Sequence, residues 1–520
     1  MAKMHLMRLR YFLFTATCFL CNCKQEYSSS NEVRIAIGSN PENLNPLFIS
    51  SVIAREVALK ANEQIEIVNP FTLKIEPSVG ELIELTDLGD GICQFAFRIS
   101  KKAKWNSGIS ITKDDIILSI KLYKLPEVTS PNIRLNLSDI ITGRIDAIDQ
   151  QIIRINVEGF CSNQRSSFVD FYILPKHIFD PYGYLDGVSI QEINERSNDL
   201  STDSRISTYV KYFNSEEFTD RLKNHSAKYA VTRVETGQFI ELTKQPDWWG
   251  FGLDKKYLTS ISNPDKIIYY IIPEDAVALI ALKNGEIDVV ENVAPYEFKN
   301  LSADDFVLLE PLLYRFGFIA FNTRVKKLTK PVRKAISMIF PYHEIIDVAL
   351  QSYGVRTVGP IFPKDSIYYN FDLEMDNKNL EEAAKILQRN GFEKVGEQWV
   401  DMERNPLSFR LSYALGVSKY HSASLIIKQA LVDFGIGVEL EGVENSLLFS
   451  RLKTHDFEMA IWGFSGGPFA HNFAPIFGLE ASAVGGLNYT GFGNQESDSI
   501  INAINIAQSN EAKSRGLLRL

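Results

Sequence analysis

The sequence predicts an α/β protein built of at least two lobes, with mixed sheets covered by helices. Short strands alternate with amphipathic helices from about residue 266 to residue 485, which is the pattern of sheets packed beneath helices. The first half of the chain is richer in strands and has fewer clear helices. A chain of 520 residues with 45% hydrophobic content is long enough for two or three packed domains.

The clearest unit of this alternation is a β-α-β segment. Residues 266–272 are rich in β-branched and aromatic side chains, and Pro273 ends this predicted strand. Asp275 places negative charge at the start of a helix that Gly285 ends, and residues 287–290 resume a strand.

Further strands and helices follow from the same signals of periodicity and turn residues. The expected helices are 380–388, 423–434 and 446–453, and the expected strands are 33–38, 94–99, 151–157, 239–243, 436–440 and 457–462.

The first residues have the pattern of an export signal. A basic segment within residues 3–10 precedes an apolar run over residues 11–20. That run is too short to span a bilayer, which takes a helix of about 20 residues. We therefore expect residues 1–22 to be a signal peptide and the protein to be extracytoplasmic.

Residues 20–23, Leu-Cys-Asn-Cys, resemble a bacterial lipobox, in which the cysteine after the cut is diacylated. Cys23 is the lipidation site that this resemblance implies, although Asn22 stands where Gly, Ala or Ser is usual. Residues 23–31 are polar and form the expected tether. We expect anchoring in the cell envelope, on the periplasmic or surface side of a membrane; the alternative is a secretory peptide without lipid.

The net charge bears on whether the protein binds nucleic acid, and the cysteine content bears on whether it forms a disulfide. The formal net charge is -9, and no Lys/Arg-rich block occurs, so we expect no nucleic-acid partner. Two cysteines remain beyond the lipobox, Cys93 and Cys161. They form either a disulfide in an oxidising envelope or two isolated buried thiols.

Metal-binding spacing is absent from the sequence. The histidines of the mature chain lie far apart, without an H-E-x-x-H pattern, and no metal-spaced cysteine pair remains. We expect no cofactor and no preformed metal site; a nickel chelate held by His455 or His471 stays open.

Several short motifs follow one another in a fixed order along the chain. They are residues 33–38 with the loop Asn43-Leu44-Asn45-Pro46, then 104–108 with 112–115, 173–177, 246–249, 284–288, 321–323 and 331–336. In this order they resemble the family 5 extracellular solute-binding proteins, the peptide- and nickel-binding components of ABC importers.

The resemblance implies a two-lobed fold like that of periplasmic binding proteins, with an inserted subdomain and a hinge near Ile271 and Gly486. A monomer of this kind closes around a small ligand and passes it to an ABC permease in the inner membrane. Members usually continue beyond the helix that residues 498–520 resemble, so we expect a shortened chain or a first lobe that closes differently. The implied segments are 32–74, 161–270 and 486–520 for the first lobe, 75–160 for the inserted subdomain and 271–485 for the second lobe.

The resemblance also implies a ligand site between the lobes. The residues that it indicates are Trp462, Phe464, Ser465 and Gly466 on the second lobe, with Asn43 opposite. Peptide-binding members commonly carry at the position of Gly467 an Asp that pairs with the α-ammonium of the ligand. Its absence leaves a short peptide or a similar oligomer as the expected ligand, without an assigned partner for its amine.

Residues 463–467 also match G-x-S-x-G, the nucleophile elbow of serine hydrolases. Such an enzyme needs an acid and then a histidine after Ser465, whereas only His471 follows, with no acid between them. We therefore expect no catalytic residues. The remaining alternative is a surface or structural lipoprotein that keeps the fold without a role in transport.

Overall fold

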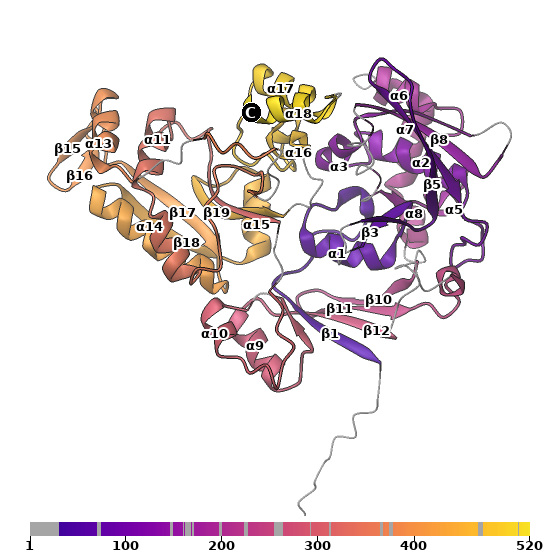
Figure 1. Cartoon of the computed structure of the whole chain (residues 1–520), viewed down its shortest axis with the longest axis horizontal. Helices are drawn as coiled ribbons and strands as arrows, with labels where there is room; N and C mark the ends of the chain where they lie inside the picture. Colours follow the sequence, from indigo (N-terminus) through magenta and orange to yellow (C-terminus); the bar gives the residue numbers. More distant parts are fainter. Residues whose placement is uncertain are drawn as a thin grey trace, which may run out of the picture.

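The computed structural model shows two lobes side by side, joined along one side (Figure 1). We call residues 31–291 the first lobe, 314–465 the second lobe and 472–519 the C-terminal segment, which lies between the two lobes. Among the described residues, no helix is both long and apolar enough to span a membrane. The structure describes residues 31–519 except 70–73, 146–148, 160, 162–167, 169–170, 197–199, 223–226, 254–263, 292, 311–313, 364–367, 374–377, 466–471 and 508.

A five-stranded sheet forms the base of the first lobe. Strand β1 (Glu32–Ile37) lies parallel to both of its neighbours, β12 (Lys266–Ile271) and β13 (Val289–Val290). The pairs β10–β11 and β11–β12 on the other side of the sheet are antiparallel. The strand order is β10 (Tyr229–Glu235), β11 (Phe239–Lys244), β12 (Lys266–Ile271), β1 (Glu32–Ile37) and β13 (Val289–Val290).

Helix α9 (Asp275–Lys283) packs on this sheet through Ala278 and Ala281, against Ala36 of β1. Because β13 also pairs with β1, the segment from α9 to β13 lies with the first lobe. This arrangement differs from the expected second lobe of residues 271–485, because the pairing of β13 with β1 joins segments far apart in the chain.

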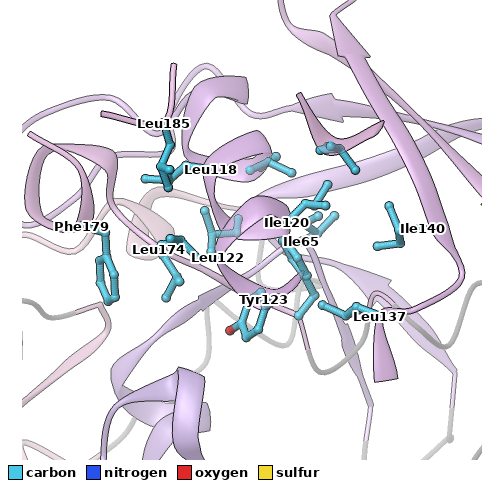
Figure 2. Packing of buried hydrophobic residues seen from close by; sticks show 14 of the residues in the cluster. Ile65, Leu118, Ile120, Leu122, Tyr123, Leu137, Ile140, Leu174, Phe179 and Leu185 are labelled. Carbon is cyan, nitrogen blue, oxygen red and sulfur yellow. The ribbon is translucent and has the colours of Figure 1, made fainter. Parts of the chain in front are cut away.

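An antiparallel sheet and α2 (Lys113–Lys124) form the largest core, at the far end of the first lobe. A capping box between Thr112 and Asp115 starts α2. Side chains of α2 such as Ile120 and Leu122 are fully buried among the surrounding elements (Figure 2). The sheet has the order β5 (Gly80–Asp87), β6 (Ile92–Ile99), β8 (Ile152–Glu158) and β7 (Ile140–Ile145).

A disulfide joins Cys93 on β6 to Cys161, with the two Cα atoms 5.3 Å apart. The sequence left this pairing open. Closing a loop of 68 residues restricts the unfolded chain, which typically stabilises a fold by about 2–4 kcal/mol.

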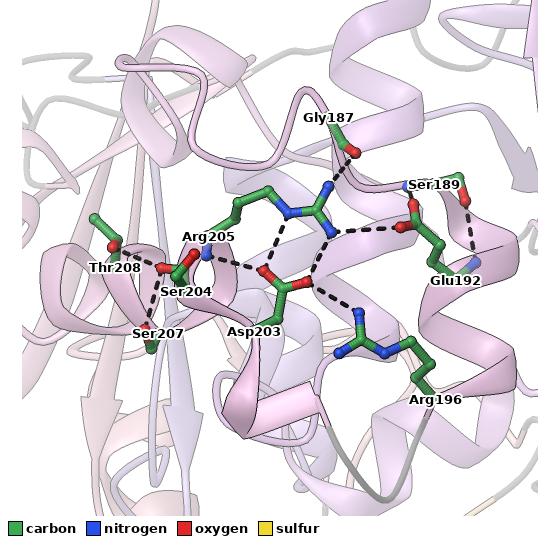
Figure 3. A network of polar contacts seen from close by, with 9 residues as sticks. All are labelled: Gly187, Ser189, Glu192, Arg196, Asp203, Ser204, Arg205, Ser207 and Thr208. Carbon is green, nitrogen blue, oxygen red and sulfur yellow. Dashed lines mark hydrogen bonds and ion pairs between the residues drawn. The ribbon is translucent and has the colours of Figure 1, made fainter.

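The rest of the first lobe consists of short elements. Asp203 caps α7 and accepts hydrogen bonds from the guanidinium groups of Arg205 and Arg196, at 2.7 and 3.0 Å (Figure 3). These bonds lower the pKa of Asp203 well below its usual range. The elements are β2 (Glu63–Gln64), β3 (Glu66–Val68), β4 (Ile75–Pro77), β9 (Tyr172–Ile173), α1 (Val52–Ala61), α3 (Pro131–Asn136), α5 (Lys176–Phe179), α6 (Ile190–Glu195), α7 (Ser204–Phe213) and α8 (Glu216–Leu222).

A four-stranded mixed sheet forms the centre of the second lobe, with helices over it (Figure 1). The strand order is β14 (Arg315–Phe321), β19 (Met459–Ser465), β17 (Ser408–Ala414) and β18 (Gly437–Val443), beside a hairpin of β15 (Glu393–Val395) and β16 (Gln398–Val400). The helices after the first lobe are α10 (Pro295–Lys299), α11 (Lys330–Ile339), α12 (Tyr342–Glu344), α13 (Leu380–Arg389), α14 (Ser418–Phe434), α15 (Asn445–Lys453), α16 (Ala474–Phe477), α17 (Gln495–Asn505) and α18 (Asn510–Arg519).

The strands and helices expected from the sequence are present, with ends shifted by a few residues. Helix α14 ends where predicted, at Gly435, whose φ of 106° lies in the left-handed region. A Cβ atom there would lie 2.4 Å from the carbonyl oxygen of Glu397. The helix begins at Ser418, one turn before the predicted start.

A buried carboxylate in the first lobe contacts two adjacent tryptophans. Glu63 is only 3% exposed and accepts hydrogen bonds from the indole N–H groups of Trp248 and Trp249, at 2.6 and 3.1 Å. Burial raises the pKa of Glu63 to about 7 against these two bonds and the charge of Lys228. The folded state therefore favours the neutral acid.

We expect the free energy of unfolding to fall as pH rises from about 4.5 to about 7, because the unfolded chain releases the Glu63 proton first. Glu63→Gln keeps an acceptor oxygen and removes the titration. Between pH 5 and pH 8, the variant should gain about 2–3 kcal/mol relative to the wild type in urea unfolding. Parallel pH profiles of the two proteins would contradict this expectation.

Candidate ligand-binding site

A cavity of about 1140 Å³ lies between the two lobes. The first lobe contributes residues 36–42, at the end of β1 and in the loop after it, and residues 49–53 before and within α1. The second lobe contributes residues 314–316 at the start of β14 and residues 462–465 at the end of β19. The C-terminal segment adds Tyr489. The walls thus combine segments that are far apart in the chain.

The loop after β1 is held by its own side chains. The Glu42 carboxylate accepts from the backbone N–H groups of Ser50 and Ser51, at 2.5 and 2.8 Å, and from both hydroxyls. Asn43, which the sequence indicated, is exposed and lies outside the cavity lining. Its Oδ1 accepts from the N–H of Asn45 at 2.8 Å, so it shapes the turn while the neighbouring Glu42 lines the cavity.

Aromatic rings form the wall of the second lobe. Trp462 and Phe464 alternate along β19 and therefore share one face of the sheet. Trp462 stacks on Phe449 with centroids 5.8 Å apart, and Phe464 stacks on Tyr489 at 5.7 Å. Burial raises the pKa of Tyr489 far above its usual range, so its hydroxyl stays neutral.

Gly463 stands between Trp462 and Phe464 in the sequence. Its lack of a side chain allows the close pairing of β19 with β14. A Cβ atom on it would lie 2.9 Å from the carbonyl oxygen of Phe316. Ser465 ends β19 opposite Arg315 and also lines the cavity. Gly466, the remaining indicated residue, lies outside the described residues. The structure thus brings Trp462, Phe464 and Ser465 together.

Three lysines line the cavity, one from each of three helices. Burial lowers the pKa of Lys419 and of Lys513 to about 8, and it lowers the pKa of Lys453 as well. Lys453 lies 3.3 Å from the hydroxyl of Ser50 and close to the Glu42 carboxylate.

Carboxylates from the first lobe face them. Glu56 accepts a hydrogen bond from Tyr269 at 3.1 Å, and Asp275 accepts from the backbone N–H of Ser418 at 3.3 Å. Partial burial and the nearby Glu56 raise the pKa of Glu291. The cavity therefore offers charges of both signs between aromatic walls.

The sequence did not point to Glu42, Lys419, Lys453 or Tyr489. Glu42 lies one residue from the indicated Asn43, which is the only local signal. The others are brought to the cavity by the packing of the two lobes, for which a single sequence carries no signal.

Among the described residues, side chains that could bind a metal do not gather into a site. The described part of the chain contains no group of three or more His, Cys, Asp or Glu side chains that could hold a metal ion. Both ring nitrogens of His455 lie 3.1 Å from carbonyl oxygens, those of Tyr489 and Ser482. His471 lies outside the described residues.

Comparison with known proteins identifies the family to which this chain belongs. The sequence signature described as "Bacterial extracellular solute-binding proteins, family 5 Middle" matches residues 82–482. The chain belongs to this family. The chain is 21% identical over 532 residues to the oligopeptide-binding protein AppA of Bacillus subtilis. The alignment covers 94% of this chain and 86% of that protein.

Solved structures of family 5 type share the two-lobed fold. The AppA structure in complex with a nonapeptide has a TM-score of 0.74 and 18% identity, covering 94% of this chain and 89% of that one. NikZ from Campylobacter jejuni in complex with Ni(L-His) has a TM-score of 0.73 and 17% identity, with the same coverage. As a member of this family, the chain is a solute-binding protein and not an enzyme, so the G-x-S-x-G match around Ser465 is no nucleophile elbow.

Trp462 is the one tryptophan among the five of this chain that lines the cavity. We expect ligand binding to change the intrinsic tryptophan emission through this residue alone. Trp462→Phe should remove the change when protein is titrated with short peptides that lack tryptophan and tyrosine. Trp399→Phe, in the core of the same lobe, should keep it; a full signal in Trp462→Phe would contradict this assignment.

Proposed function

We propose that this solute-binding protein captures short peptides, or oligomers of similar size, between its lobes and delivers them as a monomer to the permease of an ABC importer. A lipid on Cys23 would hold it at the membrane. The observation that carries the proposal is the interlobe cavity, with its aromatic walls and its charges of both signs.

The volume of the cavity supports a ligand larger than a metabolite. Pockets for drug-sized ligands measure about 300–1000 Å³, and this cavity measures about 1140 Å³. A peptide of several residues would occupy this volume more fully than a single metal chelate.

The lining also suits a chain of peptide units. β14 is an edge strand of its sheet, so part of its backbone N–H and C=O groups face away from β19. Residues 314–316 bring this edge to the cavity, where an extended ligand could pair with it. Trp462 and Phe464 offer apolar surface that accepts side chains of different shape.

Native mass spectrometry of protein purified from its own cells tests this proposal. We expect a family of bound masses spaced by amino-acid residue masses, and their release on mild activation. Denatured and refolded protein is the control, which should be free of ligand and should rebind synthetic tri- to hexapeptides. An unliganded mass under all growth conditions would contradict the proposal and favour a structural lipoprotein.

The lipid anchor is proposed from residues 20–23, which lie outside the described residues. We expect Cys23→Ser to lose incorporation of labelled palmitate and to move the protein from the membrane fraction to the soluble fraction. Cys21→Ser is the matched control, since it should stay acylated. Retention of Cys23→Ser in the membrane fraction would contradict acylation at this cysteine.

A further inference from the structure

Helix α3 of the first lobe contacts α16 of the C-terminal segment at the edge of the cavity. Figure 1 shows the two helices side by side in its upper half, whereas β1 and α9, near the passage of the chain from the first lobe to the second, lie below. Ile133 and Leu137 line the cavity on the side of α3, and Phe473 and Ile476 line it on the side of α16. The contact therefore bounds the cavity on the side away from that passage.

The contact between α3 and α16 has a polar part and an apolar part. Arg134 of α3 forms an ion pair with Glu480, in the turn after α16. The side-chain amide of Asn472 donates to the carbonyl oxygen of Leu135 at 3.2 Å. The Leu135 side chain packs against an apolar cluster of the C-terminal segment that includes Phe473. Separation of the two helices would thus expose apolar surface to water as well as break polar contacts.

The C-terminal segment is fastened to the second lobe. Thr323, which follows β14, donates through its N–H and its hydroxyl to the carbonyl oxygen of Thr490, at 2.8 and 2.7 Å. The Arg324 guanidinium donates to the carbonyl oxygen of Ser482 at 2.9 Å. Glu480 stands two residues before Ser482, so it should move together with the second lobe.

Helix α3 is fastened to the first lobe at both of its ends. The N–H of Ser130 donates to the carbonyl oxygen of Leu47 at 3.1 Å. After the last turn, the buried ammonium of Lys124 donates to the carbonyl oxygens of Leu137 and Ser138, at 2.9 and 3.1 Å. Each side of the contact is therefore fixed to its own lobe, and the contact breaks when the lobes separate.

The ion pair is of the kind that forms and breaks at little cost, since the side chain of Arg134 is 19% exposed and that of Glu480 is 51% exposed. We infer that α3 and α16 form a latch, which holds the two lobes closed over the cavity on the side away from the passage between the lobes. Arg134 and Leu135 are its positioning residues on the first lobe. The inference rests on the solute-binding role of the family and is independent of the kind of solute.

Double electron–electron resonance tests the latch by measuring distances between the lobes. Nitroxide labels on Lys101→Cys and Lys428→Cys report on exposed positions of the first and the second lobe. Protein without these two cysteines gives the background, since Cys93 and Cys161 are joined in a disulfide. In the protein as purified, we expect a short distance from the closed form and a long distance from the open form.

Arg134→Gln and Glu480→Gln should each raise the ratio of long to short distances about two- to fivefold, as for partly exposed ion pairs. The double variant should match the single variants, because all three lose the same pair. Leu135→Ala should raise the ratio about tenfold, through the lost apolar contact.

Arg154→Gln is the matched control. It breaks an ion pair with Glu84 within the first lobe, at 2.9 Å, whose side chains are 20% and 51% exposed, and it should leave the ratio unchanged. A ratio that none of the latch variants changes, an equal change in Arg154→Gln, or a double variant that adds the two single effects would overturn the latch and leave solute binding intact. A wild type that shows the long distance alone would overturn it as well.

Discussion

The insertion of β1 between β12 and β13 is the constraint on which the rest of this structure depends. Parallel neighbours cannot be joined by hairpins, and here segments more than 200 residues apart in the chain meet at β1. An ion pair between Arg34 and Asp288, at 2.8 Å, fixes the second of these pairings. Because β1 ends at Ile37, the loop with Glu42 leaves the sheet directly into the cavity.

The end of the same sheet also makes a close backbone contact with the second lobe, near Gly416. Pro273 follows β12, and a Cβ atom on Gly416 would lie 2.8 Å from its carbonyl oxygen. Gly416 has a φ of 86°, which glycine adopts without strain. The backbone N–H of Asp275 donates to the carbonyl of Gly416 at 3.2 Å. This close passage holds the start of α14, and hence Lys419, beside the cavity.

Local signals explain how much of this architecture could be predicted. Helix α13 and strand β11 were expected almost to their ends, because periodicity and turn residues act within a few positions. The pairing of β13 with β1 is a long-range choice, and a short strand carries no sign of its partner. For the site, Trp462 and Phe464 were indicated by the family resemblance, whereas Lys419 reaches the cavity only through tertiary packing.

The contacts between the lobes suggest why ligand and closure depend on each other. The lobes share hydrogen bonds from Asn445 to Ser39 at 3.1 Å and from Lys453 to Ser50 at 3.3 Å. Such bonds contribute about 1 kcal/mol each, while the same approach partly dehydrates Lys453 and Lys419. A ligand that fills the space between the aromatic walls would add contacts with both lobes, and it would favour the closed form only to the extent that it binds that form more tightly.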